Sequence, residues 1–530
     1  METTLVTGAR VLDMRHQAAH PGAVAIAHGQ ILAVGPASRL KAILPLGTPS
    51  IDLGGRLLVP GFVDGHVHLL GLALRIVGDR LDLTDTASLA EVLGAIDRYA
   101  DSLGPEEWVR GGGWDANTWP EERRPVAADL EGHAGGRSVT LTSRCGHSMW
   151  VNDVVLRKVG VGAGTADPPG GAIGRHDSGE PDGMLYESAM DLVHEHRPEI
   201  PLGRRKEALL AAIEHGHSLG LVGCHNCEGP ETLAPLLELQ REDRLRFRVT
   251  HHIPEYLVDH AAELAIGTGL GGPWLRIGSL KVFADGSLGA RTAAMLEPYA
   301  GTTETGILEH ESKAIAELAR KAEAAGLSLA VHAIGDRAVR EVLDGLEAAG
   351  GAPRASLHRL EHAQHVHPAD LGRMAQLGVV ASVQPVHLCE DAATVEQHLP
   401  GRVDQAFPFG SMAKAGIVLC FGSDAPVESF DPLDGIRAAV LRRDRAGQWP
   451  EGWTPRERVS VFQAIKAYTR GAAVASGGAL PEGEIAPGYR ADLVALSHDI
   501  LEDPDALGDC RVDMTMVGGE ILHDAAGVGS

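Results

Sequence analysis

Eight apolar, strand-like segments alternate with amphipathic stretches in the middle of the chain, and this alternation constrains the fold most. The strand-like segments are the one that ends at His66 and those at 220–224, 247–251, 275–283, 327–332, 356–362, 379–384 and 417–424. Helix-like stretches such as 205–217, 311–325 and 337–349 separate most of them. Strict alternation predicts parallel strands with crossover helices, and eight units predict an α/β fold built on a closed (β/α)8 barrel of the TIM type. An open doubly wound sheet is the alternative, but no GxGxxG sequence follows the early strands to support it.

The two ends of the chain consist of short strands and turns. Their apolar runs are residues 4–12, 23–27, 31–34, 491–496 and 514–517. Gly518-Gly519 adds a hairpin signal near the C-terminal end. Because each end alone is too short for a stable sheet with its own core, we predict that residues 1–56 and 480–530 together form one small β-sandwich domain. Residues 57–479 then form the barrel.

A long interruption, at about residues 71–205, separates the first predicted strand from the second. It has its own Gly, Pro and Trp clusters, for example at 111–115 and 168–171. Insertions at the carboxyl end of a barrel surround the active site. We therefore expect this segment to cap the pocket and to influence substrate choice more than chemistry.

Composition excludes several classes of function. The formal charge of −24 argues against nucleic acid and anionic membranes as partners. Residues 1–5 begin no basic, apolar signal segment and no apolar run reaches membrane-spanning length, so we expect a cytoplasmic protein. We also expect a homo-oligomer, with a dimer as the first expectation. Six cysteines are too few for a disulfide framework in 530 residues, and the CxxC sequence that starts at Cys224 lacks the second ligand pair of a structural zinc site.

A His-x-His sequence follows the first predicted strand. Side chains two residues apart on a strand share a face, so His66 and His68 can offer two imidazoles to one cation, and imidazole suits zinc. Polar residues also lie near the C-terminal ends of four later strands: Lys281, His332, His362 and Asp424. Any one of them alone would ordinarily be a hydrogen-bonded group without a catalytic role. In register at the end of a barrel where catalytic groups are placed, the set has the composition of a two-metal hydrolase centre.

Several segments resemble a known family. In the barrel they are PGFVDGHVH at 60–68, KVFADGSLGARTA at 281–293, HAIGDRA at 332–338, EHAQ at 361–364 and GSDAP at 422–426. Others are GHSMWVN at 146–152, DGMLYE at 182–187 and GEIAPGYRADL at 483–493. Through these motifs, which span nearly the whole length, the chain resembles the amidohydrolase superfamily, and within it the amidohydrolase-3 group of YtcJ-like and N-substituted formamide deformylase-like proteins.

The resemblance implies a binuclear metal centre. His66 and His68 would hold one divalent ion together with Asp424, and His332 and His362 would hold the other. Lys281 would bridge both, after its amine has reacted with carbon dioxide to give N6-carboxylysine, because a carbamate offers two anionic oxygens where an ammonium would be repelled. Two zinc ions per chain are the expected cofactors. A one-metal site with a neutral or displaced Lys281 is the alternative.

The same resemblance implies a metal-dependent hydrolase that acts on a carbon–nitrogen bond other than a peptide bond, in a small amide such as an N-formyl compound. A metal-activated hydroxide would attack the carbonyl, and Asp424 would serve as general base and then as general acid. Expected substrate contacts are His147, Trp150, Asp285, Arg291 and Gln384. The alternatives are a mononuclear deaminase of an aminated heterocycle, an ester or lactone hydrolase, and a non-catalytic protein that has kept the barrel.

Overall fold

The barrel predicted from the alternating pattern is present in the computed structural model, which describes residues 3–350, 357–443, 449–478 and 480–528. Eight strands pair in parallel in chain order. They are β6 (Phe62–Val67), β13 (Leu221–Asn226), β14 (Arg248–Pro254), β15 (Leu275–Phe283), β16 (Leu329–Ala333), β17 (Arg359–His362), β18 (Val380–Val383) and β19 (Leu419–Phe421). Ser356, the expected start of the sixth strand, lies outside the described residues.

The barrel is nearly closed at its carboxyl end, where the chain after β19 meets the chain after β6. The backbone N–H of Asp424 donates to the carbonyl of His66 at 2.7 Å, and the N–H of His68 donates to Ala425 at 2.8 Å. Gly422 packs closely against the chain after β6, because a Cβ on it would lie 2.4 Å from the backbone nitrogen of His66. Only glycine therefore fits at this crossing of the two strands.

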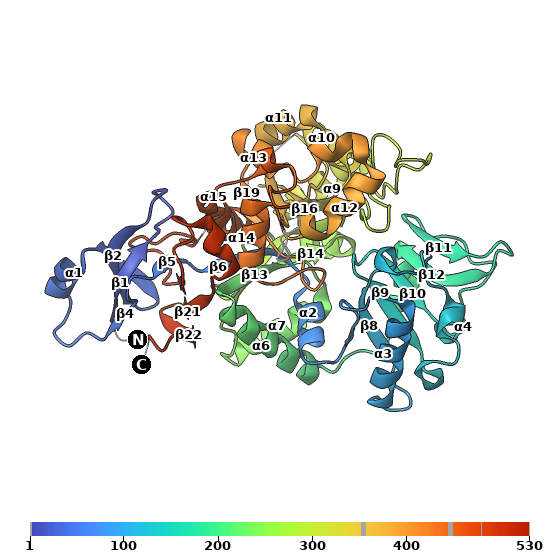
Figure 1. The fold of residues 1–530 in the computed structure, drawn as a ribbon, viewed down its shortest axis with the longest axis horizontal. Coiled ribbons are helices and arrows are strands. Elements are labelled where there is room, and N and C mark those ends of the chain that lie inside the picture. The colour runs from blue at the N-terminus through green and yellow to red at the C-terminus, as the bar shows by residue number, and fades with distance from the viewer. Residues whose placement is uncertain (1–2, 351–356, 444–448, 479, 529–530) are drawn as a thin grey trace.

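Helices cover the outside of the barrel (Figure 1). They are α2 (Leu69–Ile76), α6 (Leu202–Ser218), α7 (Pro230–Arg241), α8 (Val258–Glu263), α9 (Ser312–Ala325), α10 (Asp336–Ala349), α11 (Pro368–Leu377), α12 (His387–His398), α13 (Phe409–Lys414), α14 (Pro432–Leu441), α15 (Val461–Lys466) and α16 (Ala472–Ala475). In α10 the buried side chains Val339, Val342 and Leu346 recur at helical spacing, and the helix ends at Gly350 with φ 105°. Strand β16 between the helices and the barrel interior is buried throughout, as expected for a parallel strand with both faces covered.

The two ends of the chain build one sheet, at the left in Figure 1, where both termini also lie. Its strand order is β22-β21-β20-β5-β1-β2-β3, with β4 paired to β1. The elements are β1 (Thr4–Val11), β2 (His20–Ala27), β3 (Gln30–Gly35), α1 (Ala37–Ile43), β4 (Ser50–Asp52), β5 (Leu57–Pro60), β20 (Leu493–Leu496), β21 (Val512–Val517) and β22 (Glu520–Asp524). Because these strands form a single hydrogen-bonded sheet, the predicted β-sandwich is not confirmed, although both ends do contribute. The domain bounds 1–56 and 480–530 stay a prediction.

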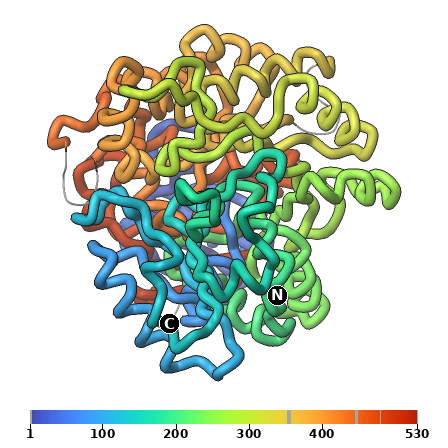
Figure 2. The backbone as a smooth tube through the Cα atoms, turned by 90° about the vertical axis from the view of Figure 1, so that its right-hand side faces the viewer, coloured from blue at the N-terminus to red at the C-terminus, as the bar shows by residue number. Residues whose placement is uncertain are grey.

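The segment between β6 and β13 forms a second sheet, at the right in Figure 1 and facing the viewer in Figure 2. Its strand order is β11-β12-β10-β9-β8-β7. The elements are β7 (Leu81–Asp82), α3 (Leu89–Asp101), β8 (Val109–Trp114), β9 (Val139–Ser143), β10 (Ser148–Val151), α4 (Asp153–Val159), β11 (Gly171–Arg175), β12 (Pro181–Glu187) and α5 (Asp191–His194). The helices and strands of this insertion pack around hydrophobic clusters of their own. Along the described part of the chain, no helix is both long and apolar enough to span a membrane.

Candidate metal centre

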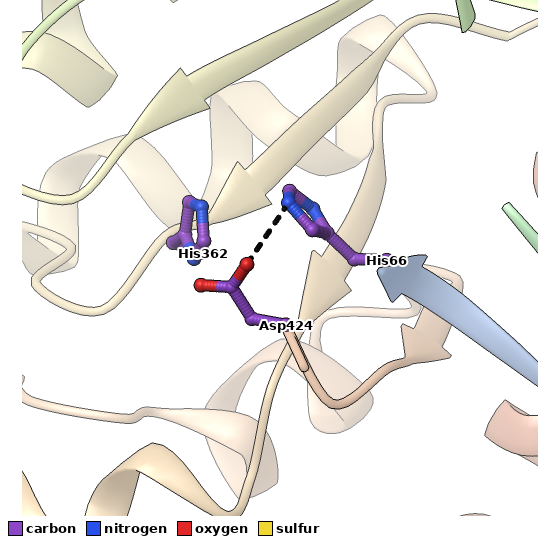
Figure 3. A group of neighbouring side chains, drawn as sticks. All are labelled: His66, His362 and Asp424. Carbon is purple, nitrogen blue, oxygen red and sulfur yellow. Dashed lines mark ion pairs between the residues drawn. The ribbon is translucent and has the colours of Figure 1, made fainter. Parts of the chain in front are cut away.

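Three buried side chains converge at the carboxyl end of the barrel (Figure 3). His66 comes from β6, His362 from the end of β17 and Asp424 from the turn after β19. Each offers one ligand atom, and these atoms all lie within 4.8 Å of one another. His66 Nε2 is 3.5 Å from Asp424 Oδ1, the contact drawn as a dashed line in Figure 3. His68 joins them from the first position before α2, with its Nε2 3.2 Å from the same oxygen. His66, His362 and Asp424 thus form a candidate ligand set for a cation, and His68 lies beside it.

The backbone at this point is unusual. His362 has φ 70° and Asp424 has φ 60°, which is the left-handed region that residues other than glycine rarely adopt. Such conformations are strained and persist where the surrounding structure fixes them, typically at functional sites. Here His362 ends β17 and Asp424 follows β19, the two strands that flank β18, and their side chains lie beside His66.

Lys281 and His332 lie on the adjacent strands β15 and β16. The Lys281 ammonium nitrogen is buried, has no hydrogen-bond partner among the described residues and lies 4.0 Å from the centre of the Phe283 ring. Burial lowers the pKa of Lys281. The His332 ring is 4.5 Å from the His362 ring, centre to centre, which joins this pair to the first group. Burial also lowers the pKa values of His332 and His362, so their imidazoles are neutral, as metal ligands must be.

A buried ion pair fixes the orientation of His66. Glu361 accepts a hydrogen bond from His66 Nδ1 at 2.7 Å and two from Arg359, at 2.8 and 3.1 Å. All of these groups are almost completely inaccessible to solvent. With Nδ1 used in this way, Nε2 of His66 is left to face Asp424, which is the usual arrangement behind a metal-bound histidine. Sequence reasoning missed Glu361 as a site residue, although a charged residue inside a buried strand next to His362 is a visible signal.

His387, at the start of α12, is a second residue that sequence reasoning missed. Its Nε2 lies 3.2 Å from Asp424 Oδ2. Burial disfavours the imidazolium, but the hydrogen bond and charge of Asp424 outweigh burial and raise the pKa of His387 to about 9. For Asp424, burial would raise the pKa, but the hydrogen bonds of His387 and His68 hold it well below its usual range. Asp424 is therefore an anion with one oxygen held by His387 and the other facing the histidine cluster.

The cavity beside these residues has a volume of about 1120 Å³. All six predicted metal ligands line it: His66, His68, Lys281, His332, His362 and Asp424. Residues of the insertion, from Leu81 to Ile200, line the same space. The insertion and the barrel mouth thus share one cavity.

Of the five predicted substrate contacts, His147 lines this cavity. Its Nδ1 is 2.6 Å from Glu187 Oε2, and its ring is 4.9 Å from the His332 ring, centre to centre. Burial would lower its pKa, but the charge and hydrogen bond of Glu187 outweigh burial and raise it. His147 is therefore held by Glu187 at the edge of the metal-ligand cluster.

The other four predicted contacts do not line the cavity. Trp150 is completely buried in the core of the insertion, where its indole N–H donates to the carbonyl of Val126 at 2.9 Å. Asp285 accepts hydrogen bonds from three backbone N–H groups behind His332, and burial raises its pKa to about 7. Gln384 is buried and donates to the backbone carbonyl of Ser382. Arg291 follows the loop that lines a neighbouring pocket at 287–290, without lining it. Their roles as substrate contacts stay predictions.

Comparisons with known proteins agree with this geometry. The model of a family described as the amidohydrolase family matches residues 50–523. YtcJ of Bacillus subtilis is 33% identical over 98% of both chains, and N-substituted formamide deformylase of Arthrobacter pascens is 29% identical over 98% of this chain and 97% of its own. A solved metal-dependent hydrolase from Pyrococcus horikoshii has a TM-score of 0.77 at 26% identity, covering 94% of this chain and 98% of its own. The chain, with its barrel and its buried ligand cluster, therefore belongs to the amidohydrolase family.

Proposed function

We propose that the protein hydrolyses a non-peptide C–N bond in a small amide, with an N-formyl amide as one candidate, using two zinc ions and Asp424 as the proton carrier. The observation that carries the proposal is the cluster of His66, His362 and Asp424, whose ligand atoms lie within 4.8 Å of one another at the carboxyl end of a parallel barrel. The similarity to N-substituted formamide deformylase supports an amide as the substrate.

The residues present fit such a metal centre. Four imidazoles and one carboxylate are the ligand types that zinc prefers. Within the described residues, Lys281 Nζ and His362 Nδ1 are buried without hydrogen-bond partners, and buried polar groups are nearly always satisfied unless a ligand completes them. The buried, weakly basic Lys281 amine suits reaction with carbon dioxide. The resulting carbamate of Lys281 would bridge the ion on His66 and His68 and the ion on His332 and His362.

When bound, the two ions would supply a hydrolytic nucleophile at neutral pH and polarise the scissile carbonyl. The chain's own residues then move the proton. Asp424 accepts it from the attacking water at Oδ1, while His387 holds Oδ2 in place. Asp424 next gives the proton to the departing nitrogen, because an amine is a poor leaving group until it is protonated. His147, anchored by Glu187 through Nδ1, offers a hydrogen bond to the substrate from the cavity wall.

The proposal is tested by Asp424→Asn, which keeps the shape of the side chain and removes the base. General acid–base catalysis contributes about 100- to 10,000-fold, and we expect kcat/KM to fall within this range for an amide. The fall should be smaller for an activated ester of the same acyl group, whose leaving group needs no proton. Metal content is measured in the same samples by elemental analysis, because Asp424 is also a proposed ligand. A variant that keeps its metals and hydrolyses both substrates at wild-type rates would refute the assigned role.

A single-ion deaminase is the second candidate, and one observation favours it. Among the described histidine, cysteine, aspartate and glutamate residues, only His66, His362 and Asp424 are close enough together to meet one ion. Elemental analysis of protein purified without chelator separates the two hypotheses. Two ions per chain support the bridged centre, whereas a ratio near one that zinc and bicarbonate do not change supports the single-ion site. Release of ammonia from aminated heterocycles, with no amide hydrolysed, would establish the deaminase.

A further inference from the structure

Three arginines of the insertion line the same cavity as the metal-ligand cluster. Arg80 lies between α2 and β7, Arg110 on β8 and Arg197 just after α5. All three line the cavity together with His66 and Asp424. The cavity is therefore lined both by the metal ligands and by these three arginines, which lie among acids such as Asp79 and Glu228.

These three guanidinium groups have no carboxylate in ion-pair contact anywhere in residues 3–350, 357–443, 449–478 and 480–528. Two other arginines that line the cavity do have one, whereas Arg205, which also lines it, contacts a backbone carbonyl of Glu231. Arg75 lies 3.5 Å from a carboxylate oxygen of Asp82, and Arg144 lies 3.1 Å from one of Glu390. The absence of an ion pair therefore distinguishes Arg80, Arg110 and Arg197 from Arg75 and Arg144.

Neutral groups orient the three side chains but leave donors free. Arg80 Nη2 donates to Thr142 Oγ1 at 3.1 Å, and Arg110 donates to a backbone carbonyl. Arg197 Nη2 contacts the sulfur of Met149 at 3.4 Å, and its Nε is buried without a hydrogen-bond partner among the described residues. Each guanidinium has five N–H donors. Several donors of the cluster are thus available to a ligand in the cavity.

The electrostatics favour an anion at this place. Burial, and then the charges of Arg80 and Arg110, lower the pKa of Arg197 to about 9. The acid whose charge acts most strongly on Arg80 is Glu228, and its carboxylate already accepts hydrogen bonds from the backbone N–H groups of Leu70 and Gly71. A bound anion would relieve the repulsion between the three like charges and supply the missing acceptors.

Arg80 lies close to the helix that follows the metal ligands His66 and His68. A Cβ built on Gly71 would lie 3.7 Å from Arg80 Nη1, and one built on Gly112 would lie 3.4 Å from Arg80 Nη2. Arg80 therefore lies between α2 and β8. Gly71 is three residues after His68, a rise of about 4.5 Å along the helix axis. A cavity of about 1120 Å³ also exceeds the usual size of a pocket for a small ligand, about 300–1,000 Å³.

We propose that Arg80, Arg110 and Arg197 bind an anionic group of the substrate, a carboxylate or a phosphate monoester, at the end remote from the scissile C–N bond. The preferred substrate is then a small amide that carries such an anion rather than a neutral amide. The position of the scissile bond rests on the function proposed above. The anion site itself does not.

The test compares three N-formyl amides that differ in this group: N-formyl-4-aminobutanoate, its neutral carboxamide and N-formyl phosphoethanolamine. They are assayed for kcat/KM and titrated by calorimetry against the metal-loaded enzyme and the variants Arg197→Met, Arg110→Met and Arg197→Lys. We expect the wild type to prefer the anionic amides, and each Met variant to lose about 10- to 100-fold on them, the value of one or more hydrogen bonds to a charged group. The neutral amide should change less than about threefold, and Arg197→Lys should retain part of the preference.

Arg241→Met is the matched control, because Arg241 is exposed on the outer helix α7 and pairs with Glu238. It removes one positive charge and should change neither preference nor binding, while metal content and melting temperature verify that every variant is loaded and folded. Equal activity on charged and neutral amides, unaltered by the Met variants, overturns the anion site and leaves the proposed amide hydrolysis intact. Anion binding that is lost in the Met variants, with none of the amides hydrolysed, supports the anion site and counts against the proposed hydrolysis. Preference for the carboxylate or for the phosphate identifies the anion.

Discussion

The role of Glu361 behind the metal centre gives the sharpest test of how the fold prepares the site. Glu361→Gln preserves shape but replaces one acceptor oxygen with an NH₂ donor, which must face either the Arg359 guanidinium or the N–H of His66. Both contacts are lost or weakened in a region with no access to solvent. Breaking a buried pair by removing one partner typically costs about 3–5 kcal/mol. Loss of the hydrogen bond behind a ligating histidine typically lowers metal affinity about 10- to 100-fold.

Asp370→Asn is the control that separates these two effects. Asp370 is as deeply buried as Glu361 and receives hydrogen bonds from Arg340 and Arg373, but at α11 on the outside of the barrel. Both variants should lower the melting temperature of the protein. Only Glu361→Gln should weaken zinc binding, measured by competition with a fluorescent chelator. Equal zinc affinity in Glu361→Gln and wild type, or an equal loss in Asp370→Asn, would refute the proposed orientation of His66.

Three further predictions concern the bridge, the barrel crossing and acid stability. Lys281→Ala should lose both metals and the carbamate signal that ¹³C-bicarbonate gives in the NMR spectrum of the wild type; a variant with full metal content would exclude the bridge. Gly422→Ala, whose Cβ would meet the His66 nitrogen at 2.4 Å, should lower both melting temperature and zinc affinity, whereas Gly372→Ala, which has open space in α11, should be neutral or stabilising. Burial lowers the pKa of His217 from 6.5 to about 4, so its stabilising contribution is present above pH 6.5 and is lost as the pH falls toward 4. The free energy of unfolding should lose about 3 kcal/mol over this range relative to His217→Gln, and parallel melting curves of the two proteins from pH 7 to 4 would contradict this.

The barrel could be predicted because its signals are local. A parallel strand buried on both faces is an apolar run, and its carboxyl end is the place where polar side chains meet. His66, His332, His362 and Asp424 each follow such a run, so the sequence indicated the ligand cluster before any contact was known. The terminal sheet was harder, because its key pairing joins β5 to β20 across more than 400 residues, and no local pattern distinguishes one folded-over sheet from two stacked sheets.

Trp150 and Asp285, predicted as substrate contacts, do not line the cavity, and the reason is geometric. Trp150 was expected beside His147, but residues an odd number apart along an extended chain point to opposite faces, so Trp150 enters the core of the insertion while His147 faces the cavity. Asp285 follows the strand of Lys281 and carries a charge, as a substrate contact would. Its oxygens are used instead by backbone N–H groups of Ala294, Ile334 and Gly335, and such long-range partners leave no signal near residue 285.

The arginines of the cavity illustrate where local reasoning ends. Arg80, Arg110 and Arg197 come from a loop, a strand and a segment after a helix, with no shared motif or spacing, and each alone resembles a solvated surface charge. Folding of the insertion brings them to one cavity, and only there does the missing ion pair become visible, since an arginine without a carboxylate partner is ordinary on a surface but costly in a cavity. Ligand types for a metal are limited and recur at strand ends, so candidate metal ligands could be named from the sequence. Which substrate group binds to the insertion depends on which of its charged side chains lack an ion-pair partner. The packing of the whole chain determines this.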